Sequence, residues 1–183
     1  MSSTEETSAT ATNSVAPALS SDPPKLVPRS ITFTIPAQDP GAPSVTVHAV
    51  EDGAGNIDIT ETVNNVPNQH SDLGGLFFDI TNAGPLTSSN LKISGPDVIY
   101  SQIGNGNVIN LAPNAPGIDM EGVASFDVGV AFSDVTTATF VLSNAAHNLT
   151  LNDLQFEEFG ARPMDQSEKI TGIAPAAPRR TRR

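Results

Sequence analysis

Hydrophobic and polar residues alternate over short segments of this chain. In Ser44–Val50 the apolar residues Val45 and Val47 alternate with polar ones, and the same period of two recurs in Ile57–Val63. Successive side chains of a β-strand point to opposite faces, so this pattern is typical of strands with one buried face. The glycine-rich segment 51–56 between the two runs predicts that they form a hairpin.

Similar β-branched runs follow one another to residue 162, separated by segments rich in Gly, Pro, Asn and Asp that favour turns. This spacing predicts an all-β fold, an antiparallel β-sandwich (jelly-roll or cohesin-like) of about 8 to 11 short strands with disordered termini. The predicted strands are Ile31–Ile35, Ser44–Val50, Ile57–Val63, Gly75–Thr81, Leu91–Ser94, Val98–Ser101, Val108–Leu111, Ser125–Phe132, Thr137–Leu142, Leu149–Leu154 and Glu157–Arg162.

The alternation also predicts which side chains form the core. Leu76, Phe78 and Ile80 share one face of their strand, so Phe77 must lie under a loop or in a second packed layer. In the next long run the expected core residues are Phe126, Val128, Val130 and Phe132, with Asp127 facing away from the core.

The two ends of the chain differ from its body in composition. Residues 1–30 are mostly Ser, Thr, Ala and Pro and contain no aromatic residue, so we expect a disordered tail. This tail lacks the basic and apolar regions of a cleavable signal peptide. We expect residues 31–162 to form the sandwich domain and residues 163–183 a second tail, which ends in an arginine cluster.

The body is strongly acidic. Residues 31–162 hold fifteen Asp and Glu against only Lys92 and Arg162, and the whole chain has a net charge of −11. Such a body repels nucleic acid and anionic membranes, so we expect neither as a partner. The chain has no Cys, which excludes disulfides and thiolate metal sites. No apolar run is long enough for a transmembrane helix, so we expect no membrane insertion.

Several segments of the body follow one another in an order that is found in a known protein family. They are Asp72–Asp79, Asn107–Leu111, Phe126–Phe132, Thr139–Ser143, Leu149–Leu151 and Phe159–Arg162. Over about residues 44–162 the chain resembles a β-rich module of large secreted bacterial proteins, often found beside haemolysin-type (RTX) calcium-binding repeats. The resemblance implies type I secretion, an extracellular, calcium-rich setting and no catalytic residues. Gly74 stands where the family pattern has Arg, and the chain has no glycine-rich nonapeptide repeat of its own.

Calcium is the cofactor that the acidic loops favour, because it binds carboxylate and carbonyl oxygens in irregular geometry. No EF-hand loop is present, and no cluster is specific enough to assign metal ligands, so these remain unknown. The candidate loop carboxylates are Asp52, Asp58, Asp72, Asp119, Glu121, Asp153, Glu157 and Glu158.

Catalytic motifs are missing from the sequence. His48, His70 and His147 have no partner at the spacing of a metal site, and we expect each to be a surface or turn residue. Glu121, Glu157 and Glu158 could in principle serve a glycosidase, but Tyr100 is the only Tyr and there is no Trp to hold a sugar. The segment Gly104–Asn107 is expected to be a turn rather than a phosphate-binding loop. We therefore expect no catalytic residues and, apart from the unknown calcium ligands, no cofactor-binding residues.

Three functions remain open at this point. The first is a non-enzymatic extracellular module for adhesion, matrix or surface recognition, stabilised by calcium. The second is a self-assembling structural subunit that uses its terminal arms for β-augmentation, forming a homo-oligomer. The third is a small jelly-roll hydrolase or lyase.

Overall fold

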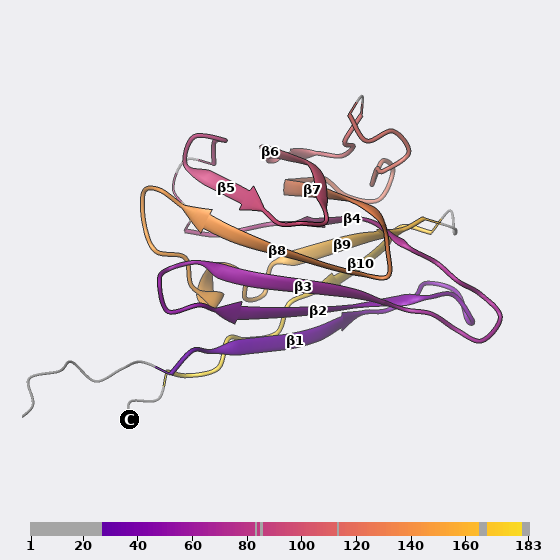
Figure 1. The fold of residues 1–183 in the computed structure, drawn as a ribbon, viewed down its shortest axis with the longest axis horizontal. Coiled ribbons are helices and arrows are strands. Elements are labelled where there is room, and N and C mark those ends of the chain that lie inside the picture. Colours follow the sequence, from indigo (N-terminus) through magenta and orange to yellow (C-terminus); the bar gives the residue numbers. More distant parts are fainter. Residues whose placement is uncertain (1–26, 83, 85, 113, 165–167, 181–183) are drawn as a thin grey trace, which may run out of the picture.

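The computed structural model describes residues 27–82, 84, 86–112, 114–164 and 168–180. The described chain forms an all-β sandwich of two antiparallel five-stranded sheets (Figure 1). The first sheet has the order β1-β2-β3-β8-β5, made of β1 (Ser30–Ile35), β2 (Ser44–Glu51), β3 (Ile57–Asn64), β8 (Thr137–Asn144) and β5 (Leu91–Ser94). The second has the order β10-β9-β4-β7-β6, made of β10 (Ile170–Ile173), β9 (Glu158–Pro163), β4 (Leu73–Phe78), β7 (Phe126–Val135) and β6 (Val98–Val108).

The predicted fold class is thereby confirmed, and most predicted strands are present. The pairing of β2 with β3 confirms the predicted hairpin, with Val47 opposite Glu61. The main core lies between the sheets, where aromatic rings form a continuous chain. Phe33 packs edge-on against Phe159 with ring centroids 5.0 Å apart, Phe159 stacks on Phe78 at 5.4 Å, and Phe78 stacks on Phe140 at 6.5 Å.

A second, smaller core covers the outer face of β4 and β7. Phe77 lies there under the segment that follows β6, together with Leu111, Ile118 and Met120. This confirms the prediction that Phe77 lies under a loop or in a second packed layer. A Cβ atom on Gly129 would lie 2.8 Å from Leu111 Cδ2, so only glycine at this position of β7 lets the covering segment approach the sheet.

Phe126 is an exception to the predicted pattern, because it packs in this second core and not in the main one. Val128, Val130 and Phe132 do face the main core. The regular backbone pairing of β4 with β7 ends at the pair Phe78–Val128, and hydrogen bonds from backbone N–H groups to side-chain carboxylates follow it. Asp79 Oδ1 accepts the N–H of Asp127, whose Oδ2 accepts the N–H of Ile80. The strict alternation of β7 ends at this irregularity, and β4 ends at Phe78 instead of Thr81.

One predicted strand is wrong. The segment Leu149–Leu154 contains a short 3-10 helix, Leu151–Asp153, instead of a strand. Its capping box explains the difference, because Asp153 Oδ2 accepts both the N–H of Thr150, at 2.7 Å, and the Thr150 hydroxyl, at 3.0 Å. The predicted strand Val108–Leu111 is also reduced, with Val108 ending β6 and Asn110 forming an isolated bridge to Asp119.

The second sheet continues past residue 162, the predicted boundary of the sandwich. β10 pairs with β9, and Ala174, which follows β10, is buried. The expected tail therefore adds an edge strand to the second sheet. Of the expected N-terminal tail, residues 1–26 lie outside the described residues, as do Arg182 and Arg183 of the arginine cluster.

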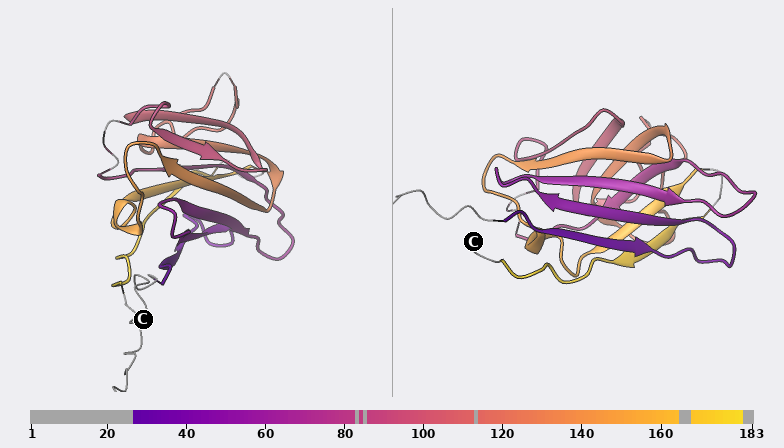
Figure 2. Two further views of the ribbon diagram at one scale, coloured as in Figure 1. Left: turned by 60° about the vertical axis from the view of Figure 1, so that its left-hand side comes forward. Right: turned by 60° about the horizontal axis from the view of Figure 1, so that its bottom comes forward.

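Both ends of the described chain lie at the same end of the sandwich, at the left in Figure 1 and in the right-hand view of Figure 2. We call this the terminal end. The β1–β2, β3–β4 and β9–β10 connections lie at the opposite end, which we call the loop end. Across the described residues, no helix has the length and apolar character needed to cross a membrane.

Candidate functional site

The loop end contains a polar hollow of about 680 Å³. Four connections that are distant in the sequence contribute to it, and they belong to both sheets. Its lining consists of Gln38, Asp39, Pro40, Gly41, Ala42, Gln69, Val123, Glu168 and Lys169. Loops held by a rigid β-sandwich are a common place for recognition, so this hollow is the candidate functional site.

Glu168 joins two walls of the hollow. Its Oε1 accepts the backbone N–H groups of Gln38, at 2.7 Å, and of Asp39, at 3.0 Å. The side-chain amide of Gln38 donates in return to the carbonyl oxygen of Lys169 at 2.9 Å. The β1–β2 connection is thus fixed against the start of β10, and both sheets hold the hollow in shape.

Lys169 holds a third wall. Its ammonium group forms an ion pair with Asp119 and donates to the carbonyl oxygen of Glu121 at 2.8 Å. Burial alone would raise the pKa of Asp119, but the hydrogen bond from Lys169, the N–H of Glu121 and the positive charges of Lys169 and Arg162 lower it below its ordinary value. Lys169, the lysine among the described lining residues, is therefore already paired with a carboxylate.

The remaining side chains of the hollow are open to a ligand. Within the described chain, neither the Asp39 carboxylate nor the Gln69 amide has a hydrogen-bonding partner, and both side chains are at least partly exposed. Val123 adds an apolar surface and is 45% exposed. The hollow thus offers an unpaired negative charge, an amide and an apolar surface.

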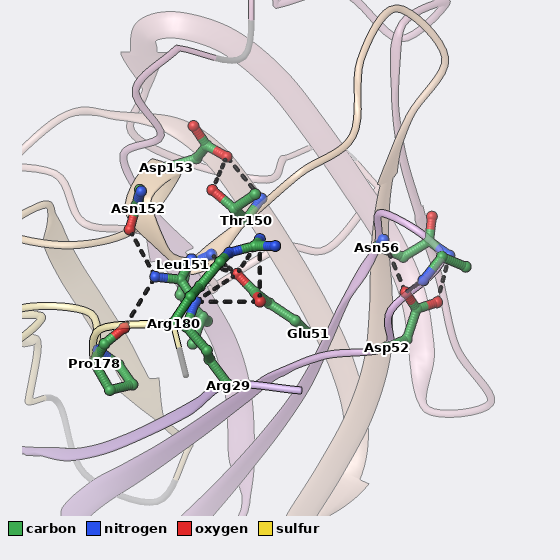
Figure 3. A network of polar contacts seen from close by, with 11 residues as sticks. Arg29, Glu51, Asp52, Asn56, Thr150, Leu151, Asn152, Asp153, Pro178 and Arg180 are labelled. Carbon is green, nitrogen blue, oxygen red and sulfur yellow. Dashed lines mark hydrogen bonds and ion pairs between the residues drawn. The ribbon is translucent and has the colours of Figure 1, made fainter. Parts of the chain in front are cut away.

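A second polar assembly lies at the terminal end and has a structural role (Figure 3). Arg29 Nη2 lies 2.5 Å from Glu51 Oε1, and both side chains are buried. Arg29 Nη1 donates to Asn152 Oδ1 at 3.1 Å and to the carbonyl oxygen of Pro178 at 3.0 Å. Arg180 lies 3.4 Å from Glu51. We call these five residues the clasp.

The clasp controls the ionisation of its carboxylate. Burial works to raise the pKa of Glu51, but the hydrogen bonds from Arg29 and the Leu151 N–H, with the charges of Arg29 and Arg180, lower it overall. Arg180 of the expected arginine tail therefore contacts the body of its own chain.

The candidate calcium ligands are dispersed, and several are engaged by the protein itself. Asp52 accepts the N–H groups of Ala54, at 2.6 Å, and of Asn56, at 3.0 Å, in the β2–β3 turn (Figure 3). Asp58 lies exposed on β3, and Asp72 is half-buried just before β4. None of these three carboxylates lines the hollow.

Near β9 the carboxylates do come closer together. Asp153 caps the short helix, whereas Glu157 and Glu158 lie near Asp79. Burial raises the pKa of Asp79 to about 6, and the charges of Asp127, Glu157 and Glu158 add to this rise against the bond from the Asp127 N–H. In the part of the chain that the structure describes, no group of three or more His, Asp or Glu residues is arranged to hold a metal ion.

The three histidines lie on separate elements. His48 is on β2 and its Nδ1 lies 2.7 Å from Thr32 Oγ1 on the neighbouring strand. His70 lies exposed in the β3–β4 connection at the loop end, and His147 lies in the segment between β8 and the short helix. The two loop histidines are at opposite ends of the sandwich. Of the glycosidase candidates, Glu121 lies in the second-core segment, Glu157 directly before β9 and Glu158 at its start.

Gly104–Asn107 is an irregular stretch within β6 and precedes no helix. Asn107 Nδ2 donates to the carbonyl oxygens of Gly104 and Asn105, both at 3.0 Å, so the segment is closed by its own side chains. The predicted turn between two strands is thus an irregularity within the single strand β6, between Ile103 and Val108.

The sequence analysis did not single out two unusual residues, Glu61 and Phe156. Glu61 sits on the inward face of β3, fully buried, and within the described chain neither of its carboxylate oxygens has a hydrogen-bonding partner. Phe156 has a left-handed backbone, with φ of 62°, and its side chain is 65% exposed. Glu61 follows Ile57 and Ile59 on the inward face of β3, but the sequence alone does not reveal whether its carboxylate has a partner.

Comparisons of the chain with protein-family models, with curated proteins and with solved structures found no match.

Proposed function

We propose that this protein is a non-enzymatic, extracellular recognition module that binds a surface or matrix partner through the loop-end hollow. The observation that carries the proposal is the unpaired Asp39 carboxylate in a hollow built by loops from both sheets. The extracellular setting is supported by the resemblance to modules of secreted bacterial proteins.

The chemistry of the hollow favours a basic side chain of the partner as its ligand. The aliphatic stem of a Lys or Arg would pack on Val123, and its charged head would meet Asp39 and the Gln69 amide. Lys169 would not oppose this, because Asp119 already neutralises it. The net charge of −13 on residues 31–162 would attract a basic partner from a distance.

The test is an NMR titration of the isotopically labelled protein with a short arginine-containing peptide. Shifts should concentrate at Gln38, Asp39, Gln69 and Val123, and an equally long glutamate peptide should produce none of them. Asp39→Lys should abolish these shifts. The matched control is Asp58→Lys, which makes the same charge change at an exposed position on β3 outside the hollow. Equal losses in the two variants would show only general attraction to an acidic body, and the proposed site would be wrong.

Calcium stabilisation remains part of the proposal. It is supported by the resemblance to modules found beside calcium-binding repeats and by the net charge of −13 on residues 31–162, whose mutual repulsion a bound cation would reduce. Thermal unfolding with calcium, magnesium or chelator at equal ionic strength tests it. A rise in Tm specific to calcium is expected, because a ligand that binds only the folded state stabilises it.

A further inference from the structure

The charges of the body leave one region neutral. Residues 80–118 contain a single base, Lys92, and a single acid, Asp97, so the net charge of −13 on residues 31–162 resides entirely on the rest of the body. This neutral region includes β5, β6 and the segment that begins the second core. In Figure 1 it forms the upper side of the sandwich.

Strand β6 is an open edge within this neutral region. It is the outermost strand of the second sheet, and among the described strands it pairs with β7 alone. Its eleven residues contain no charged residue and no proline. Natural proteins usually protect an edge strand with charges, prolines, bulges, short length or a covering segment, because its free N–H and C=O groups can pair with another chain. β6 has irregularities on both sides of Tyr100–Ile103, and this stretch between them keeps the regular pairing geometry.

The other edges are better protected. β10 has four residues and lies against β1, where a Cβ atom on Gly172 would be 3.4 Å from Ile35 Cα. β1 and β10 therefore shield each other along the lower side of the sandwich. β5 also has four residues, and one of them is Lys92.

The exposed surface of β6 is apolar at its start. Ile99 is 55% exposed and lies at the irregularity between Val98 and Tyr100, where the register with β7 shifts. A second shift follows Ile103, so Tyr100–Ile103 is the regularly paired stretch. A partner strand would pair with this stretch and cover Ile99.

We propose that two copies of the chain associate through their β6 strands, which pair antiparallel about a twofold axis and join the two second sheets into one. The charge distribution favours this edge for contact between two copies. Two bodies with the same large negative charge repel each other in every orientation that brings acidic surfaces together. The neutral β6 edge is the surface through which they meet with least repulsion, and a twofold contact uses the same edge on both copies.

The first test is sedimentation velocity of the full chain over a range of concentrations and salt. We expect a monomer–dimer equilibrium that strengthens with salt, because salt screens the repulsion between the acidic bodies. Ile99→Asp should weaken the dimer at least about tenfold in Kd, equivalent to about 1.4 kcal/mol. The matched control, Ile173→Asp, alters an isoleucine that is 60% exposed on the other edge of the same sheet and should leave Kd unchanged.

The second test uses the absence of native cysteine. Gln102→Cys lies in the regular stretch of β6 and should form an intermolecular disulfide on mild oxidation, whereas Thr171→Cys on β10 should not. Hydrogen exchange at Tyr100–Ile103 should also be faster on dilution. A monomer at all concentrations and salts overturns the proposal, as does equal weakening by the two Asp variants or equal cross-linking through β10.

Discussion

Arg29 Nε donates to both carboxylate oxygens of Glu51, at 3.1 and 3.2 Å, and both side chains are buried. This pair connects the residue before β1 to the last residue of β2. The same carboxylate accepts the N–H of Leu151 at 3.0 Å, so three segments meet on one buried charge.

Arg29→Leu should destabilise the protein strongly, because it leaves the Glu51 carboxylate buried without its main partner. Breaking a buried ion pair by removing one partner costs about 3–5 kcal/mol. Arg180→Ala should cost less than about 1 kcal/mol, since the side chain of Arg180 is 41% exposed and its contact with Glu51 is longer. Urea unfolding of both variants measures the difference.

The pH dependence provides a further check on this pair. The folded state lowers the pKa of Glu51, so the stability it contributes is present above the ordinary pKa of 4.5 and is lost as the pH falls through the folded value. Arg29→Leu should weaken this acid sensitivity. Equal losses in Arg29→Leu and Arg180→Ala at neutral pH would contradict the central role of the buried pair.

Glu61→Leu should stabilise the protein at neutral pH. Burial raises the pKa of Glu61 from 4.5 to about 8, so the folded state binds a proton that the unfolded state has released between these values. Stability contributed by this group is therefore full below pH 4.5 and falls as the pH rises to about 8. Between pH 4.5 and pH 7 the free energy of unfolding thus falls by roughly 3 kcal/mol, on the order of 1.4 kcal/mol for each pH unit.

Unfolding free energies of wild type and variants from pH 4 to 9 test this prediction. Both Glu61→Leu and Glu61→Gln should lose the decline in stability between about pH 5 and 8, because neither side chain titrates. At neutral pH the leucine variant should have the higher free energy of unfolding of the two, since glutamine keeps a buried polar group in the core. An unchanged pH profile in Glu61→Gln would mean that Glu61 is not the titrating group.

Leu111→Ala should release the segment over the second core before the main sandwich unfolds. Truncating a buried leucine typically costs about 2–5 kcal/mol, and Leu111 packs over Gly129 with no exposed surface. Exchange of the Leu111 and Met120 amides should accelerate, while exchange in β2 and β3 stays slow. Val123→Ala, at an exposed position of the same segment, is the control. Uniformly faster exchange would mean that the two cores unfold together.

Phe156→Asn should leave stability unchanged or raise it by up to about 1 kcal/mol. Phe156 has a φ of 62°, which Asn adopts more readily than Phe, and its exposed ring contributes little burial. Phe156→Ala removes the ring but keeps the strained backbone, so it should show no such gain. Thermal unfolding compares the three proteins. A clear loss in the asparagine variant would reveal that the ring makes stabilising contacts.

Alternation in the sequence predicted the elements in which each strand has one buried face. Val45 and Val47 lie in the main core, and the position of Phe77 under a covering segment followed from the same period. Alternation gave wrong predictions where side chains accept hydrogen bonds from backbone N–H groups that would otherwise pair between strands. Thr150 and Asp153 form a capping box in a segment of strand-like composition, and Asp79 and Asp127 end the alternation that placed Phe126 in the wrong core.

The candidate site could not be read from the sequence. Asp39, Gln69, Val123 and Glu168 are far apart along the chain, and only the pairing of the strands brings their loops to one end of the sandwich. β10 was also missed, because Ile170–Ile173 is short and precedes a proline-rich segment. The strand forms because β9 offers an edge with which it can pair.

The clasp also determines how the protein would respond to mechanical tension. Force applied at residues 29 and 180 would pull β1 and β10 sideways from their sheets, a geometry in which hydrogen bonds break one after another. However, Arg29 donates a hydrogen bond to the carbonyl oxygen of Pro178, and Arg180 forms an ion pair with Glu51. A load entering at one end of the described chain would therefore pass to the other across these contacts, and the sandwich would be spared until the clasp opens.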